Sequence, residues 1–287
     1  MPVPALLALV VLAGYMVFTL ASNIIYWYET LNSPEPAIPS PRPGVFSCLF
    51  CYLNSLGSYL LCAVVFVLGP FSHRRVAKSR VQNPALPPLI LIHGIYNSAA
   101  VWRYLGRRFA RAGFPFSTCS YRSFFTSPQC IIQSLEEHVR TVETVFPGQK
   151  PVFVCHSLGG LIVRHWLLAP GNRERVGGVL TLGAPHKGSK MAALGPGRLV
   201  KHILPTADFI RALQNAPDPA PLPCVSLASP TDEAVLPPAS LVPPQGWRLR
   251  VTNRLGHFSM LFCPRAARIV MEELNGIVRA QEEGKTS

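Results

Sequence analysis

The residues best suited to chemistry are a serine, an acid and a histidine, each just after a short apolar stretch. Ser157 lies in PVFVCHSLGG (151–160), Asp232 follows PCVSLAS (223–229), and His257 follows WRLRVT (247–252). A serine hydroxyl becomes a nucleophile when an imidazole takes its proton, and a buried carboxylate fixes the imidazole tautomer and stabilises its charged form. The chain order Ser, Asp, His therefore predicts a nucleophilic serine site, if the fold brings the three together.

The chain beyond residue 86 has the pattern of a scaffold that would do so. Short apolar runs alternate there with helical patterns. Parallel strands need a crossover connection, so this alternation predicts an α/β fold, a mostly parallel sheet flanked by helices. Sites in such sheets form beyond the carboxyl ends of the strands, where all three residues fall. The expected strands are 89–94, 116–121, 151–156, 176–183, 223–229 and 247–252, and the expected helices are 98–113, 128–146, 158–169 and 264–281.

Five segments at the ends of these strands resemble the α/β-hydrolase superfamily, most closely its lipase and esterase branch. They are HGIYNSAAVW, VCHSLGGLIVRHW, LGAPHKGS, SPTDEAVLPP and LGHFSML. The resemblance covers roughly residues 87 to 281 and implies an α/β-hydrolase catalytic domain over that range. It places Ser157 on a tight turn from strand to helix. The family pattern G-x-S-x-G appears here as C-x-S-x-G, with Cys155 in place of the first glycine.

The resemblance also implies a role for each site residue. Ser157 matches the nucleophile, His257 the general base and Asp232 the acid. The backbone N–H groups of Ile95 and Leu158 match the donors that stabilise the oxyanion. The rivals for base and acid between or beyond these positions are His165, His186, His202, Glu174, Asp208, Asp218 and Glu233.

The segment 188–221 has no clear strand, only short apolar stretches broken by Gly and Pro. In lipases a lid over the acyl pocket lies at this place in the chain, so the resemblance makes the segment a possible lid. Its apolar side chains would then contact an acyl chain; alternatively, they cap the hydrophobic core. These side chains are Leu194, Leu199, Val200, Ile203, Leu204, Phe209, Ile210 and Leu213.

The N-terminal part of the chain has the composition of a membrane protein. Of the 287 residues 49% are hydrophobic and 14% charged, and neither 1–28 nor 43–72 contains a charged side chain. Each run exceeds the roughly 20 residues that a helix needs to cross a hydrocarbon core. Two transmembrane helices are predicted, at 1–28 and 45–72, joined by a Pro-rich loop at 29–44. A cleaved signal peptide is the alternative for the first run, although the expected positive charges at its start are missing.

The flanks of the two helices predict their arrangement. The second run contains Asn54, Ser55 and Ser58, and small and polar residues are common where membrane helices pack together, so a closely packed hairpin is expected. The loop between the runs is poor in basic residues, whereas the linker at 73–86 contains HRRVAKSR. By the positive-inside tendency, this integral membrane protein has its catalytic domain on the cytoplasmic side.

The net charge of +13 does not indicate a nucleic-acid partner, because none of the usual binding modules is present. Part of the basic charge lies beside the membrane, where it attracts anionic lipid. Cys48 and Cys51 form a C-x-x-C pair that is either redox-active or, inside an apolar run, a pair of soft packing residues. The cysteines show no disulfide or zinc spacing, so no metal and no cofactor is predicted.

These features together predict a membrane-anchored serine hydrolase that cleaves carboxylic esters, lipid-like ones, through a covalent acyl-enzyme. Its expected partners are a lipid or acyl-ester substrate and membrane lipids. The same residues would cleave a thioester, as in removing an acyl group from a protein, or would transfer the acyl group to another alcohol. A catalytically silent membrane scaffold with a hydrolase fold is the alternative of a different class. Residues 282–287 are expected to form a tail.

Overall fold

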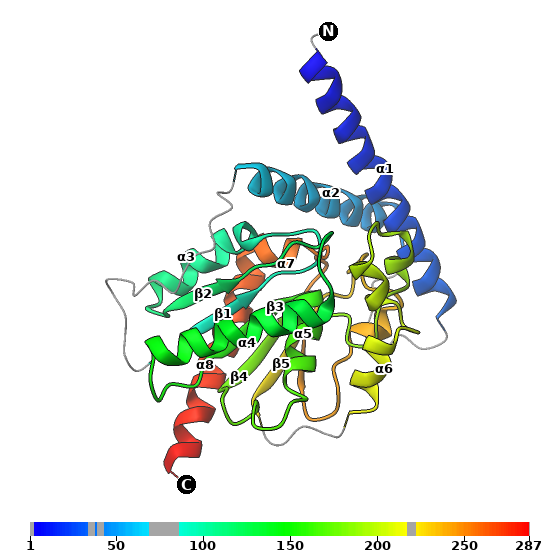
Figure 1. Ribbon diagram of the computed structural model, residues 1–287. Coiled ribbons are helices and arrows are strands. Elements are labelled where there is room, and N and C mark those ends of the chain that lie inside the picture. Colours follow the sequence, from blue (N-terminus) through cyan, green and yellow to red (C-terminus); the bar gives the residue numbers. More distant parts are fainter. Residues whose placement is uncertain (1–2, 34–37, 39–42, 69–85, 217–221, 287) are drawn as a thin grey trace.

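The computed structural model describes residues 3–33, 38, 43–68, 86–216 and 222–286. Two long apolar helices precede one α/β domain, and both lie on the same side of it (Figure 1). The expected basic linker lies outside the described residues apart from residue 86, as do 69–72 of the second expected span.

Six strands form the centre of the domain, in the order β2-β1-β3-β4-β5-β6. All five neighbouring pairs are parallel, which confirms the predicted sheet. Each expected strand is present, and each is one to three residues shorter than expected. The strands are β1 (Leu89–Ile92), β2 (Phe116–Cys119), β3 (Val152–His156), β4 (Gly178–Leu182), β5 (Cys224–Ala228) and β6 (Arg248–Val251).

Helices cover both faces of this sheet. On one face α4 (Pro128–Val145) and α5 (Leu158–Trp166) pack against alternate strand residues such as Ile90 and Ile92. On the other, α3 (Arg103–Arg111), α7 (Ser259–Phe262) and α8 (Pro264–Thr286) pack against Leu89 and Leu91. This alternation is the period of two that a buried strand imposes. The first expected helix begins as a 3-10 turn, η1 (Ala99–Trp102), and α8 continues to Thr286.

The continuation of α8 corrects the expectation of a separate tail at 282–287. Residues 282–286 are helical, because Gln and Glu in QEEGKT favour helix and extend the preceding turns. The expected loop at 29–44 also begins later than predicted, since α1 (Val3–Asn32) includes its first four residues.

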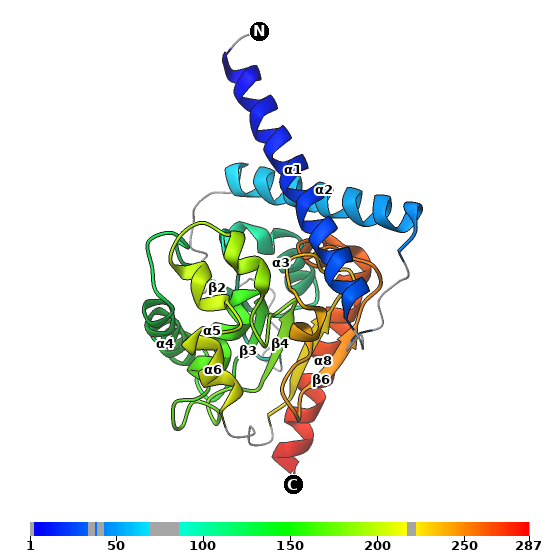
Figure 2. The same cartoon turned by 90° about the vertical axis from the view of Figure 1, so that its right-hand side faces the viewer.

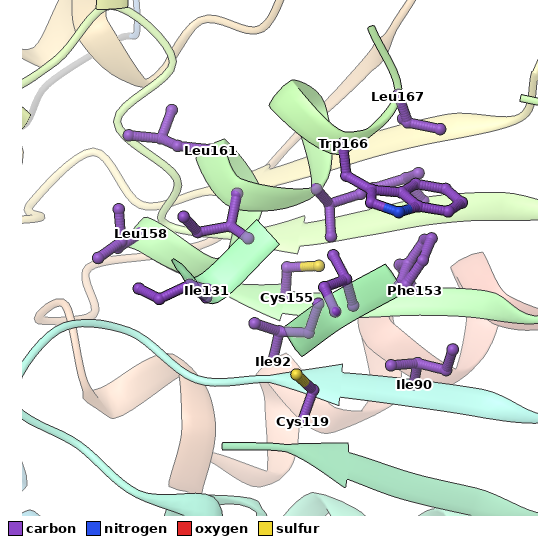
Figure 3. Packing of buried hydrophobic residues seen from close by; sticks show 14 of the residues in the cluster. Ile90, Ile92, Cys119, Ile131, Phe153, Cys155, Leu158, Leu161, Trp166 and Leu167 are labelled. Atoms are coloured by element: carbon purple, nitrogen blue, oxygen red, sulfur yellow. The ribbon is translucent and has the colours of Figure 1, made fainter. Parts of the chain in front are cut away.

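The core beneath the candidate site is well packed. On β3, Phe153 meets the Trp166 ring edge to face, with ring centroids 5.5 Å apart, and Cys155 lies among neighbouring apolar side chains (Figure 3). Both β3 side chains are fully buried. The strand that ends at Ser157 is therefore held by dense packing from α5.

The two N-terminal helices have the length and composition of membrane helices. Within α1 and α2 (Val45–Leu68), the segments Leu9–Asn32 and Val45–Phe66 each have a mean hydropathy of 1.8, and most of each is not covered by protein. Phe18 of α1 contacts Tyr59 of α2, with ring centroids 5.6 Å apart. Figures 1 and 2 show the helices crossing one another, so they pack as a crossed pair and not as the expected hairpin.

Helix α2 lies along the α/β domain with two distinct faces. Its buried face consists of small side chains: Cys51, Ser55, Ser58 and Cys62. Its outer face is large and apolar: Phe46, Leu49, Phe50, Leu53, Leu61 and Val64. The polar residues of this run were expected at a contact between the two membrane helices. They instead face the catalytic domain, where the loops around Glu233 and Gly256 can pair with them.

The segment proposed as a lid forms three short helices: η2 (Lys190–Leu194), η3 (Leu199–Ile203) and α6 (Asp208–Gln214). Most of its apolar side chains cap the core, since Leu199, Val200, Ile203, Phe209, Ile210 and Leu213 are buried in it. Leu194 is largely exposed. Residues 217–221 lie outside the described part. A further 3-10 turn, η4 (Pro238–Leu241), follows the loop after β5.

The packing of Phe153 generates a stability prediction. Replacing it with Ala removes a fully buried ring and leaves a cavity, which costs about 3–5 kcal/mol of unfolding free energy. For a domain of this size, each kcal/mol lowers the midpoint of thermal unfolding by roughly 2–4 °C. The midpoint of the variant, measured in detergent, should therefore lie clearly below that of the wild type. Phe125→Ala is the matched control, because Phe125 is 87% exposed. Equal midpoints for the two variants would contradict the packing described.

Candidate active site

Ser157 lies on a tight turn between β3 and α5. Its backbone angles are φ 54° and ψ −123°, a region that a non-glycine residue occupies only under strain. The turn is tight because α5 starts close to β1: a Cβ on Gly159 would lie 2.5 Å from the carbonyl oxygen of Ile92. The thiol of Cys155 points into the core and not into this turn (Figure 3). The C-x-S-x-G variant thus keeps the geometry of a nucleophile elbow.

Asp232 and His257 come together at the ends of β5 and β6. Nδ1 of His257 lies 2.8 Å and 3.0 Å from the two carboxylate oxygens of Asp232, and both side chains are buried. Burial alone lowers the pKa of His257, but the charge of Asp232 and its hydrogen bond outweigh burial and raise this pKa above its usual value. The pair is therefore arranged to stabilise a protonated imidazole.

Gly183, just after β4, makes room for this pair. Its φ of 57° lies in the left-handed region, and a Cβ there would be 3.0 Å from Asp232 Oδ2 and 3.1 Å from His257 Nδ1. Any side chain at this position would be strained and would push against the Asp–His contact.

The rival side chains lie elsewhere. His165 packs on Phe209 with its Nε2 2.6 Å from the Phe209 carbonyl oxygen, and His186 is bonded to Ser226. The side chain of Asp208 is 98% exposed, and Asp218 lies outside the described residues. Within the described ranges, no three His, Cys, Asp or Glu side chains are grouped so as to hold a metal ion.

The loop after β1 carries the expected oxyanion donor Ile95. His93 braces this loop: its Nδ1 donates to the Gly94 carbonyl (2.8 Å), while its Nε2 accepts the Tyr121 N–H (3.2 Å). Burial lowers the pKa of His93 to about 4, so the ring stays neutral in this structural role. Ile95 lines the same cavity as Ser157. The other expected donor, the N–H of Leu158, is the first of α5 and has no partner within the helix.

Ser157 and His257 both line a cavity of ≈ 700 Å³. In the described part of the chain, no hydrogen bond joins the Ser157 hydroxyl to the His257 imidazole. Catalytic hydrogen bonds are often long without substrate, so this geometry is compatible with closure when a substrate enters. The segment 188–221 contributes Met191, Ala192, Leu194, Val200 and Ile203 to the cavity lining.

The loop that carries His257 is held by groups that the sequence analysis did not connect to the site. The Gly256 N–H and the Ser259 hydroxyl donate to Oδ1 of Asn54 on α2, at 2.8 Å and 2.7 Å. The His257 N–H donates to Oε2 of Glu233 at 3.2 Å. In the sequence, the only indication of this role was that Asn54, Ser55 and Ser58 are polar residues within an apolar run. Packing between two membrane helices explained their polarity equally well.

Glu233 is a second buried carboxyl group next to Asp232. Burial, followed by the charge of Asp232, raises the pKa of Glu233 to about 7. The hydroxyls of Ser55 and Tyr59 on α2 lie beside its carboxyl group. Glu233 was a rival for the catalytic acid. It contacts the backbone of His257, whereas Asp232 contacts the imidazole.

Comparison with known proteins agrees with the fold described above. Residues 87–206 match the family model of the alpha/beta hydrolase fold, whereas no curated protein matches the sequence. The chain is similar to the mature lipase BlEst2 of Bacillus licheniformis, with a TM-score of 0.61 and 19% identity, covering 69% of this chain and 96% of that one. It is also similar to Aspergillus fumigatus lipase B, with a TM-score of 0.57 and 17% identity, covering 69% and 55%. These matches show the α/β-hydrolase fold that the sequence segments predicted.

The contact between Asn54 and the His257 loop can be tested by substitution. Asn54→Ala leaves the Gly256 N–H and the Ser259 hydroxyl without this acceptor, which should cost about 1–3 kcal/mol of unfolding free energy. The measurement is the thermal midpoint of the full-length protein in detergent. Asn32→Ala is the control, because the exposed Asn32 amide donates to the Tyr28 carbonyl in its own helix. If both variants unfold alike, Asn54 does not support the loop.

Proposed function

We propose that this protein is a membrane-bound serine hydrolase that cleaves carboxylic esters of lipids through Ser157, His257 and Asp232. One observation carries the proposal: the hydrogen-bonded Asp232–His257 pair opens on the same cavity as a serine held on a strained elbow. Neither the Asp–His pair nor the strained serine turn alone would indicate catalysis. Acyl transfer needs both, and both lie at the same edge of the sheet.

In this mechanism, His257 Nε2 accepts the Ser157 proton as Oγ attacks the ester carbonyl carbon. The N–H groups of Ile95 and Leu158 stabilise the resulting oxyanion, and each such donor is worth about 3 kcal/mol. The tetrahedral intermediate collapses, the C–O bond to the alcohol breaks, and His257 returns its proton to the leaving alcohol. Water then attacks the acyl-enzyme and gives a proton to His257. The second tetrahedral intermediate collapses, its bond to Ser157 Oγ breaks, His257 returns the proton to this oxygen, and the carboxylic acid leaves.

The preference for lipid esters is supported by the apolar surroundings of the site. Most side chains that line the cavity are apolar, and the two N-terminal helices lie beside it. The two proteins of similar fold are named as lipases. We propose that α1 and α2 hold the domain at the membrane, with the domain on the cytoplasmic side, so that an apolar substrate need not cross water.

A fluorophosphonate probe tests the nucleophile. It should label the wild type and should not label Ser157→Ala, because the probe reacts with an activated serine. Ser134→Ala is a matched control on the exposed side of α4 and should label normally. Folded wild-type protein that takes no label would favour the catalytically silent scaffold.

The Asp232–His257 contact predicts a pH dependence. His257 must be neutral to accept the serine proton, so activity is lost as the pH falls through its pKa. Because this pKa is raised above the usual 6.5, the acid limb of kcat/KM should lie above pH 6.5. Asp232→Asn removes the charge that raises the pKa, so the limb should move to lower pH, and kcat should fall by about 10⁴.

Ester hydrolysis measured across the pH range would check this shift. Asp208→Asn, which changes a carboxylate whose side chain is 98% exposed, should leave both limb and rate unaltered. An Asp232→Asn enzyme with wild-type activity would assign the acid role to another residue.

A further inference from the structure

Both apolar helices line the cavity that contains Ser157. From α1 come Val11, Gly14, Tyr15 and Phe18, and from α2 come Tyr59, Cys62, Ala63 and Phe66. In each helix these positions follow the spacing i, i+3, i+4, i+7, which is one continuous face of a helix. Each helix thus presents a stripe to the cavity about two turns long, or ~10 Å. A helix that served only as a tether would need no such face.

A series of ring contacts orders this stripe relative to the catalytic residues. The ring of Phe258 lies 5.1 Å from that of His257, and Tyr59 lies 5.0 Å from Phe258. Phe18 then contacts Tyr59 at 5.6 Å. The Phe18 end of the α1 stripe is therefore the end nearer to His257, and Gly14 and Val11 follow one and two turns further away.

The distant end of the cavity is open toward the outer surface of the helices. Val11 and Gly14, at this distant end, are both exposed, Val11 to 50%, although both also line the cavity. The surface around them is apolar, and Figures 1 and 2 show the N-terminal half of α1 extending beyond the catalytic domain. An apolar passage therefore connects the serine with the surface that the proposed function places in lipid.

We propose that α1 and α2 form the acyl-binding surface of the active site and that Gly14 sets the longest acyl chain it accepts. The occupant is the acyl chain of a long-chain ester, entering from the bilayer between the two helices. This inference rests on the proposed function, because it assigns the substrate of that same site.

Gly14 lies where the cavity has free space for an acyl chain. A Cβ built on it would have no neighbouring atom within 4 Å, and the residue lines the cavity. Glycine within a helix is unfavourable by roughly 0.5–1 kcal/mol relative to alanine, so local helix stability does not explain its presence. Gly57 of α2 is equally uncrowded and, like Gly14, exposed, but it is not among the residues that line the cavity. The two glycines are a matched pair for substitution.

The experiment compares Gly14→Leu with Gly57→Leu in the full-length protein reconstituted in phospholipid nanodiscs. The substrates are p-nitrophenyl esters from butyryl to palmitoyl, and the readout is the ratio of kcat/KM for palmitoyl over butyryl ester. Leucine at 14 should exclude about two methylenes of a long chain, which lowers this ratio roughly tenfold. Gly57→Leu should keep the wild-type ratio. Ala63→Phe, which fills the cavity from α2, should lower the ratio as Gly14→Leu does.

The outcomes separate the inference from the proposed function. If the wild type hydrolyses esters but all three variants keep its ratio, the acyl chain does not lie along α1 and α2, and the inference is overturned. If the wild type neither hydrolyses any ester nor takes the fluorophosphonate label, the proposed function fails and the inference fails with it. Labelling of each variant by the fluorophosphonate probe shows that it is folded. Gly14→Leu and Ala63→Phe fill the cavity from different helices, so a lowered ratio in both cannot be an effect of one particular substitution.

Discussion

The arrangement of the site depends on two adjacent buried carboxyl groups beside one imidazole. Two carboxylates with no solvent repel each other, so their environments must differ. Oδ1 of Asp232 also accepts the N–H groups of Ala234 and Val235, at 3.0 Å and 3.1 Å, which stabilise its charged form beyond the contact with His257. Glu233 accepts the His257 N–H, and its pKa is raised to about 7. Glu233 therefore holds a proton more readily than a free carboxyl group, whereas Asp232 accepts hydrogen bonds from the imidazole and from two backbone N–H groups.

This separation of roles depends on a helix that is distant in sequence. Helix α2 faces Glu233 with Ser55 and Tyr59 and holds the His257 loop through Asn54. A buried acid with no hydroxyl neighbours would be more costly, and a loop with no acceptor for Gly256 would be less ordered. The small polar side chains of α2 therefore allow the loops after β5 and β6 to be buried beneath an otherwise apolar helix.

The sequence predicted what depends on local pattern. The six strands follow from apolar runs bounded by turns, and the parallel sheet follows from their alternation with helices. Ser157, Asp232 and His257 could be grouped as candidates because the carboxyl ends of parallel strands share an edge. The role of Asn54 could not be predicted, since its partner Gly256 lies 202 positions away and its polarity fitted a helix-to-helix contact equally well. The crossing of α1 and α2 was missed for the same reason: hydropathy reports the length of a span but not the surface it packs on.

The contacts of α1 lead to the same conclusion as those of α2. The Tyr26 hydroxyl donates to the Pro230 carbonyl, in the loop that carries Asp232. Glu29 pairs with Lys190 of the segment that caps the cavity, at 2.9 Å. Tyr26 and Trp27 form a small core with Cys51 of α2 and Leu236 of the catalytic domain. Because these contacts reach the acid loop, the capping segment and α2 together, a displacement of α1 must move parts of the active site. The helices and the candidate site therefore form one structural unit, so the proposed attachment of the helices to a membrane would also orient the site.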